Sequence, residues 1–162
     1  MDPLKNATLV FLVKRRSGVI TEICLAMKKR GFGMNRWNGA GGKVEVGEST
    51  EEAAVRETRE EVGVIVQEMY KVAELLFYFF GNAPWNQRVG VYLCEQWVGE
   101  PTESEEMNPR WFAVDKIPFT DMWPDDIFWL PEILKGKLVK ANFTFSDNDV
   151  IKDQCVEIVE RL

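Results

Sequence analysis

The chain has no histidine among its 162 residues. Catalysis by Ser-His-Asp or Cys-His arrangements is therefore excluded, as are zinc and iron sites that use histidine ligands. Any catalytic chemistry must depend on carboxylates, lysine, arginine, tyrosine, cysteine or a metal ion held by oxygen atoms. Carboxylate and carbonyl oxygens favour hard cations such as magnesium and manganese.

Cysteine is scarce, and Cys24, Cys94 and Cys155 are widely spaced in apolar or strand-like segments. This pattern favours buried thiols in a reducing compartment over a disulfide framework or a zinc site. No apolar run approaches the length of a membrane span, and the first residues lack the order of a signal peptide. We therefore expect a cytoplasmic protein, with the nucleus and mitochondria as alternatives, and no membrane partner.

Basic residues are outnumbered, and the net charge is −6. The chain has no basic stripe, so we expect no nucleic-acid partner, because tight binding to a phosphate backbone needs many cationic contacts. A small phosphorylated ligand stays open, since a bound divalent ion can supply positive charge. The length predicts one domain, residues 1–162, and we expect a monomer.

Segments with strand character outnumber helical ones. The pattern predicts strands over residues 7–14, 19–28, 71–80, 88–97, 138–146 and 149–159, and helices over about 49–62 and 125–135. Residues 31–42 contain five glycines in twelve positions, which predicts a loop whose backbone closely approaches another group. Residues 99–109 and 118–124 are expected to be irregular. The sequence therefore predicts an α+β sandwich, a curved mixed sheet flanked by helices.

An unusual concentration of carboxylates follows the Gly41-Gly42 turn. At about 100° per residue, Glu60 and Glu61 lie about 60° and 40° either side of Glu57, so the three share one helix face. On the same wheel Val55, Thr58 and Val62 form the face expected to pack against the sheet, with the small Ala53 and Ala54 on the carboxylate side.

Two interpretations of this face compete. It can be a solvated acidic surface, softened by ion pairs with Arg56 and Arg59, as in most glutamate-rich helices. It can also be a metal site, because the preceding glycine turn can expose carbonyl and N–H groups to a metal and to phosphates. The combination of the turn and the cluster favours the metal site.

The same stretch resembles the Nudix box, G-x5-E-x7-R-E-U-x-E-E-x-G-U, where U is aliphatic. The matching residues are Gly42, Glu48, Arg56, Glu57, Glu60, Glu61, Gly63 and Val64. Thr58 departs from the pattern, but it is β-branched and can still pack. The resemblance implies a Nudix αβα sandwich with a curved mixed sheet between helices.

Segments outside the box, MKKRGFGMNRWNGAGGKV, EMNPRWF and IPFTDMWPDDIFWLP, resemble the animal-type oxidised purine nucleoside triphosphate hydrolases. This resemblance covers roughly residues 7–146. It implies hydrolysis of oxidised purine nucleoside triphosphates, such as 8-oxo-dGTP and 2-hydroxy-dATP, to the monophosphate and pyrophosphate, which sanitises the nucleotide pool. The small-molecule triphosphate would then be the partner.

The resemblance also implies the catalytic and metal-binding residues. Magnesium, with manganese as the alternative, would be held by the Gly41 carbonyl and by Glu57, Glu60, Glu61 and Glu106. Arg56 would orient the glutamates through charge-assisted hydrogen bonds, and Glu48 would tie the loop to the start of the helix. For Glu106, an ordinary acidic loop is the alternative that the sequence alone favours.

The expected substrate-binding residues surround a base and its phosphates. They are Thr8, Lys28, Phe32, Asn38, Ala40, Gly41, Gly42, Lys43, Phe77, Phe79, Trp123, Pro124, Asp125 and Asp126. Two adjacent buried carboxylates tend to keep one proton between them and so offer a purine both a donor and an acceptor. Trp129 is expected to wall the pocket together with Phe32, Phe77 and Phe79, although ordinary core packing is equally open for the phenylalanines. For Asp125 and Asp126, capping of a helix is the alternative.

Two further functions stay open. One keeps the Nudix chemistry on another substrate, a dinucleoside polyphosphate, ADP-ribose or O6-methyl-dGTP. The other is a nucleotide-binding module without catalysis, which would be expected to have lost some of the box carboxylates, whereas this sequence retains them all.

Overall fold

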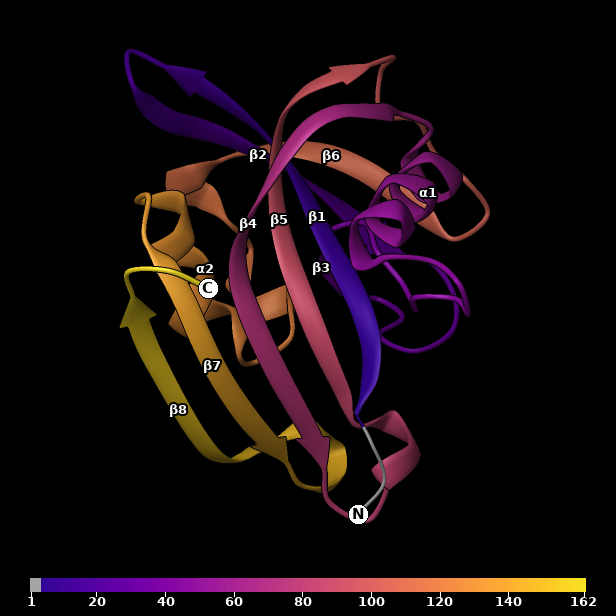
Figure 1. Cartoon of the computed structure of the whole chain (residues 1–162), viewed down its shortest axis with the longest axis vertical. Coiled ribbons are helices and arrows are strands. Elements are labelled where there is room, and N and C mark those ends of the chain that lie inside the picture. The colour runs from indigo at the N-terminus through magenta and orange to yellow at the C-terminus, as the bar shows by residue number, and fades with distance from the viewer. Residues whose placement is uncertain (1–3) are drawn as a thin grey trace.

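The computed structural model describes residues 4–162, so residues 1–3 of the predicted single domain lie outside the described residues. Eight strands form one sheet in the order β3-β2-β1-β5-β4-β7-β8, and β6 pairs with β2. The strands are β1 Lys5–Arg16, β2 Val19–Lys28, β3 Trp37–Asn38, β4 Ile65–Phe79, β5 Gln87–Val98, β6 Met107–Ala113, β7 Leu138–Phe145 and β8 Ile151–Val159. The two α-helices are α1 Thr50–Val62 and α2 Asp126–Leu134 (Figure 1).

The helices cover opposite faces of the sheet, as the alternation of β1 shows. Phe11 and Val13 belong to one buried cluster, which also contains Trp129 from α2. Val10 and Leu12, which point to the other face, belong to a second cluster that contains Ala54 and Val62 from α1. Because both faces of β1 are buried, its sequence is a continuous apolar run. The predicted sandwich of helices around a mixed sheet is confirmed.

The first two strands pair with each other as a hairpin only near their turn. The register pairs Val13 to Arg16 of β1 with β2, whereas Lys5 to Leu12 pair in parallel with β5. Residues 40–43 of the glycine-rich loop lie along the other edge of this first part of β1. They are joined to it by bridges from Val10 to Ala40 and from Ala7 to Lys43. This arrangement places the Gly41-Gly42 turn beside a central strand.

Helix α1 begins and ends at the predicted residues. Ser49 caps it by accepting a hydrogen bond from the Glu52 backbone N–H, and Gly63 ends it in the left-handed conformation, φ 76°. The packing face differs from the prediction: Ala53 and Ala54 are fully buried against the sheet, while Val55 is only half-buried. The small alanines let the helix lie close to the strands.

Other element boundaries extend beyond those predicted. Strand β4 begins at Ile65 rather than near residue 71, and β6 begins at Met107 inside a segment expected to be irregular. Both extensions are set by pairing partners, β5 for β4 and β2 for β6. Within residues 4–162, no helix is long and apolar enough to cross a membrane.

Candidate active site

The Gly41-Gly42 turn is fixed by hydrogen bonds to β1. The Thr8 backbone N–H donates to the Gly42 carbonyl at 2.9 Å, and the Val10 N–H donates to the Ala40 carbonyl at 2.6 Å. The turn passes so close to β1 that a Cβ on Gly41 would lie 1.9 Å from the Thr8 carbonyl oxygen. A Cβ on Gly42 would lie 2.6 Å from the Glu57 carboxyl carbon. Gly41 therefore cannot carry a side chain, whereas a side chain on Gly42 would have to displace the Glu57 carboxylate.

Glu61 links this turn to α1. Its Oε1 accepts a hydrogen bond from the Gly41 backbone N–H at 2.7 Å, and its side chain is almost completely buried. Burial raises the pKa of Glu61 to about 7, against the opposing effects of the Gly41 N–H and of Lys28. Burial also raises the pKa of Glu57. Because burial disfavours their negative charge, a nearby cation or a bound proton would stabilise these two carboxyl groups.

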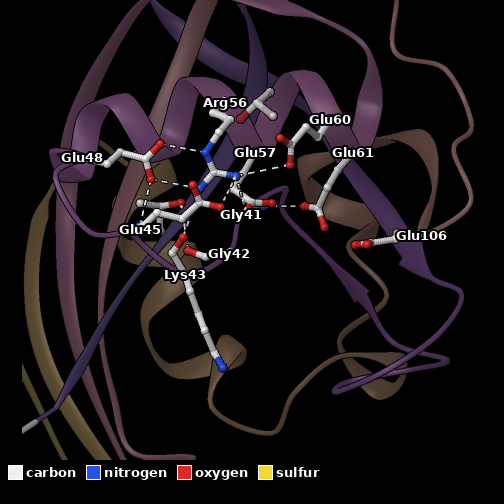
Figure 2. A network of polar contacts seen from close by, with 12 residues as sticks. Gly41, Gly42, Lys43, Glu45, Glu48, Arg56, Glu57, Glu60, Glu61 and Glu106 are labelled. Atoms are coloured by element: carbon white, nitrogen blue, oxygen red, sulfur yellow. Dashed lines mark hydrogen bonds and ion pairs between the residues drawn. The ribbon is translucent and has the colours of Figure 1, made fainter.

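Arg56 is the centre of the polar network that Figure 2 shows. It donates to both oxygens of Glu48, at 2.7 Å from Nε and 2.9 Å from Nη2, and to Glu57 Oε1 at 2.9 Å. It also donates to Glu60 Oε2 at 3.3 Å and to the Lys43 carbonyl at 3.2 Å. The bidentate contact with Arg56 holds the pKa of Glu48 at about 2. Arg56 and Glu48 therefore join the loop before α1 to the helix.

The predicted metal ligands have the right chemistry but are turned toward basic side chains. Lys28 Nζ lies 3.9 Å from Glu61 Oε2 and 3.7 Å from Glu106 Oε2, while Arg56 contacts the other two glutamates. Within residues 4–162, no group of three acidic, cysteine or histidine side chains is arranged to hold a metal as the side chains stand. The oxygen-only donors and the raised carboxyl pKa values fit a hard divalent cation once those contacts are exchanged.

A pocket of about 290 Å³ opens beside the box. It is lined by twelve residues from the predicted substrate-binding set, together with Glu61 and Trp129; the twelve are Thr8, Lys28, Phe32, Asn38, Gly41, Gly42, Lys43, Phe77, Phe79, Trp123, Asp125 and Asp126. Sequence segments separated by more than 80 residues thus meet in one cavity.

Counting both aspartates, twelve of the fourteen predicted substrate-binding residues line the pocket, and Ala40 and Pro124 do not. Ala40 is buried in the cluster under α1, because it pairs with Val10 of β1 and its side chain points to the opposite face of the sheet. Pro124 precedes α2 and contributes no lining surface among the described residues. Pairing of the loop with β1 thus turns Ala40 away from the cavity, and substrate contacts of Ala40 and Pro124 stay predictions.

The aspartate pair lies at the start of α2 and is almost completely inaccessible to solvent, with 2% exposure for Asp125 and 3% for Asp126. Trp129 Nε1 donates a hydrogen bond to Asp125 Oδ2 at 2.7 Å, whereas Asp126 Oδ2 is buried without a partner within residues 4–162. Burial raises the pKa of Asp125 to about 6 and raises that of Asp126 further, where the neighbouring carboxylate adds to the effect. The pair therefore retains a proton near neutral pH, and one oxygen is free to bind a ligand.

These aspartates do not act as the helix cap that the sequence left open. Asp125 occupies the cap position of α2, but its side chain makes no capping hydrogen bond. The carboxylates instead point into the pocket. Asn38 also faces this pocket: its Oδ1 accepts a hydrogen bond from the Gly39 backbone N–H at 2.9 Å, which orients the side-chain amide.

Aromatic rings form the apolar wall of the pocket. Phe32 stacks on Trp123 with ring centroids 5.1 Å apart, and Phe79 meets Trp123 edge-on at 6.3 Å. The sequence interpretation missed several lining residues, namely Ala7, Leu9, Gly33, Gly39, Gln87, Val89, Met107 and Phe145. Phe145 had a signal, since it lies on β7 beside Phe79 of β4, two strands whose alternation places both rings on one face. The parallel pairing itself could not be seen in the sequence.

Trp85 lies in the 3-10 turn η1, Ala83–Trp85, and is 47% exposed. Its ring meets Phe32 edge-on at 5.0 Å. Trp85 therefore supports the pocket wall from outside and is not among the residues that line the cavity.

Comparison with known proteins agrees with this geometry. The family model described as "NUDIX domain" matches residues 3–133. The chain is 45% identical over 158 residues to the oxidized purine nucleoside triphosphate hydrolase of Danio rerio, covering 98% of this chain and 97% of that protein. It is 48% identical over 129 residues to the protein of the same name from Mus musculus, covering 80% and 82%.

The fold is also found in solved structures. The crystal structure of a MutT protein from Bacillus halodurans matches with a TM-score of 0.81 at 21% identity, over 95% of this chain and 98% of that one. At this identity the likeness concerns the fold alone. The family model covers most of the chain, and the box residues of that family meet at one turn and one helix. The chain therefore belongs to the Nudix hydrolase family.

Proposed function

We propose that the chain hydrolyses oxidised purine nucleoside triphosphates, of the 8-oxo-dGTP and 2-hydroxy-dATP type, to the monophosphate and pyrophosphate. One observation carries the proposal: a single pocket is lined both by the buried Asp125–Asp126 pair and by Glu61 with the Gly41-Gly42 turn. A base held by the aspartates would thus share a cavity with the hydrolytic carboxylates. The relatives from Danio rerio and Mus musculus, both named oxidized purine nucleoside triphosphate hydrolase, support the same substrate class.

The aspartate pair suits a purine whose edge carries both a donor and an acceptor. Near neutral pH the pair has one ionised and one protonated carboxyl group, which accept and donate hydrogen bonds respectively. Asp126 Oδ2 has no partner within residues 4–162, so a base would satisfy it. A pocket built on buried polar groups rejects analogues that leave those groups unpaired. Selection of oxidised over normal purines would follow from this property.

Nudix hydrolases generally use a divalent metal ion, and here we propose magnesium, with manganese as the alternative. The Gly41 carbonyl and the carboxylates of Glu57, Glu60, Glu61 and Glu106 would hold it. When bound, the ion neutralises phosphate charge and lowers the pKa of the attacking water.

The surrounding residues would orient these ligands and the substrate. Arg56 anchors the Glu57 and Glu60 carboxylates through its hydrogen bonds, which restricts their rotation. Lys28 and Lys43 line the pocket and would contact phosphate oxygens. Lys28 would exchange its present carboxylate contacts for those of the substrate. The rings of Trp123 and Phe32 would form the apolar contact with the base.

The test is a magnesium-dependent hydrolysis panel of 8-oxo-dGTP, 2-hydroxy-dATP, O6-methyl-dGTP, dGTP, ADP-ribose and a dinucleoside polyphosphate. We expect the highest kcat/KM for the two oxidised purines, with monophosphate and pyrophosphate as products. Preference for ADP-ribose or for the dinucleoside polyphosphate would overturn the proposal and favour another Nudix substrate. No turnover of any compound would favour the non-catalytic binding module. Running the reaction in oxygen-18 water locates the attacked phosphorus.

The remaining predictions from composition stay predictions. These are a monomer, a cytoplasmic location with the nucleus and mitochondria as alternatives, and no nucleic-acid or membrane partner. Size-exclusion chromatography with light scattering checks the first of them.

A further inference from the structure

Arg36, which the sequence interpretation did not single out, lies behind the base pocket. Its guanidinium carbon is 4.1 Å from the centroid of the Trp123 ring, over the ring. Its Nη1 donates a hydrogen bond to Asp149 Oδ2 at 2.9 Å, and both side chains are about two-thirds buried. A guanidinium fixed over an indole is attracted by the ring electrons, and partial burial strengthens that attraction.

The Arg36–Asp149 pair connects two segments that are far apart in the sequence. Arg36 lies in the loop between β2 and β3, where the Lys28 backbone N–H donates to its carbonyl at 3.0 Å. Asp149 lies in the turn between β7 and β8, where it and Asn148 adopt left-handed conformations with φ of 57° and 64°. Residues other than glycine seldom adopt this conformation, and contacts with the surrounding structure must stabilise it. The ion pair with Arg36 is one such contact of Asp149.

The charge of Arg36 also acts on the aspartate pair. It opposes the effect of burial and lowers the pKa of both Asp125 and Asp126. Besides the two aspartates, the charged side chains that line the pocket are Lys28, Lys43 and Glu61. Arg36 does not line the pocket, so its charge would remain beside the aspartates when a substrate binds.

From this geometry we propose that Arg36, anchored by Asp149, is a positioning residue that fixes the Trp123 ring and determines how tightly the pocket holds a purine base. The proposal rests on the proposed function for its substrate, but its contacts belong to the pocket alone. It gives the β7–β8 turn a part in base selection, although the turn itself lies outside the pocket lining. Loss of the anchor should weaken base binding while leaving the hydrolytic carboxylates unaffected.

The test compares Arg36→Met, Arg36→Lys and Asp149→Asn with the wild type. Arg36→Met should raise KM for 8-oxo-dGTP by about 3- to 30-fold, the range expected when a partly buried cation–π contact is lost, with kcat changed by less than about 2-fold. Arg36→Lys should recover part of the loss. Asp149→Asn should raise KM by about 2- to 5-fold, and the double variant should be no worse than Arg36→Met alone, because the two residues act as one unit.

A binding measurement separates this proposal from the proposed function. Calorimetry with 8-oxo-dGMP and dGMP in EDTA reads base binding without turnover. Arg36→Met should raise the Kd of the better-bound nucleotide by the same factor as it raises KM. The pH at which nucleotide affinity changes should also rise, because removal of a nearby positive charge raises the pKa of the aspartates. If the wild type binds these nucleotides but does not hydrolyse oxidised triphosphates, the proposed function fails and the Kd values still decide the role of Arg36.

Arg15→Met is the matched control, since Arg15 forms a bidentate pair with Glu95 at 2.9 and 3.1 Å and does not line the pocket. It should leave KM and Kd within about 2-fold. Unchanged KM, Kd and pH dependence in a folded Arg36→Met variant would overturn the proposal. If Arg36→Met does not fold, Asp149→Asn decides: it keeps Arg36, and an unchanged Kd there overturns the anchoring role.

Discussion

Arg56 and Glu48 form a bidentate pair that joins α1 to the loop before it, with Nε to Oε2 at 2.7 Å and Nη2 to Oε1 at 2.9 Å. The same guanidinium donates to Glu57 at 2.9 Å through its remaining terminal nitrogen. Only a planar fork can serve three acceptor atoms in this geometry, and an ammonium group cannot. Glu48, which is not a proposed metal ligand, therefore holds Arg56 in place, and Arg56 in turn orients the proposed ligand Glu57.

Arg56→Lys should lower activity although the charge is kept. We expect kcat/KM to fall by about 10- to 100-fold, as is typical when a residue that orients metal ligands is replaced. The magnesium concentration needed for half-maximal activity should rise. Steady-state kinetics over a magnesium titration measures both. Arg59→Lys, on the exposed side of the same helix, is the control, and equal effects in the two variants would contradict the orienting role.

Glu61→Gln should abolish turnover and preserve nucleotide binding. The amide oxygen can still accept the Gly41 N–H hydrogen bond, so the turn keeps its position, while one anionic metal ligand is lost. We expect kcat to fall by more than about 100-fold. Calorimetry with 8-oxo-dGMP in EDTA should give a Kd within about 2-fold of the wild type, since the contacts to the base are unchanged. Undiminished turnover would remove Glu61 from the mechanism.

The buried Glu61 should also make the metal-free protein less stable as the pH rises. Its pKa is about 7 in the folded protein and 4.5 when exposed, so the folded state holds a proton that the unfolded state releases. That stabilisation is complete below about pH 4.5 and is lost as the pH rises through about 7.

Urea denaturation in EDTA at pH 5.5 and pH 8 measures this effect. The loss of unfolding free energy between the two should be about 2 kcal/mol larger for the wild type than for Glu61→Gln. Magnesium should stabilise the wild type more at pH 8, because metal ligands must be deprotonated. The same pH dependence in both proteins would contradict the assignment.

Asp125→Asn should weaken selection of the oxidised base. The variant keeps the size of the side chain but removes the ionisable group beside Asp126, so the pair can no longer offer one donor and one ionised acceptor. We expect KM for 8-oxo-dGTP to rise by about 10-fold or more, with a smaller change for dGTP. The ratio of kcat/KM for the two substrates measures selectivity. An unchanged ratio in both Asp125→Asn and Asp126→Asn would contradict base reading by the pair.

Adding a methyl group to each glycine of the box turn should give two different results. In Gly41→Ala the Cβ would meet the Thr8 carbonyl oxygen at 1.9 Å, a backbone contact that cannot yield, and we expect a loss of about 3 kcal/mol or more of stability. In Gly42→Ala the Cβ would meet the Glu57 carboxyl group at 2.6 Å, and this flexible group can rotate away. Stability should then change little while kcat falls by about 10-fold or more. Thermal unfolding and kinetics distinguish the two.

Local signals were sufficient for the helices and for most of the strands. Ser49 and Gly63 bound α1 because capping and a left-handed C-terminal residue depend on the chain within a few positions. The wheel also placed Thr58 and Val62 correctly on the packing face. It misplaced Ala53 and Ala54, because a small side chain reveals little about which side of a helix lies against a sheet.

Pairing between distant segments was beyond such signals. The split of β1 between β2 and β5, with residues 40–43 taking the place of β2, depends on contacts that no local pattern encodes. It is this pairing that turns the side chain of Ala40 away from the pocket and brings Gly41 to Glu61.

The sequence by itself limited the chemistry open to this protein: a chain without histidine, with three glutamates on one helix face after a glycine turn, favours oxygen ligands for a hard cation. Periodicity and residue type carry that information, since both are properties of a short segment. Only the tertiary structure decided that the buried pair Asp125–Asp126 shares a pocket with those glutamates, and that Arg36 lies behind Trp123. Burial and distance create these relationships, and both arise when segments far apart in the chain pack together.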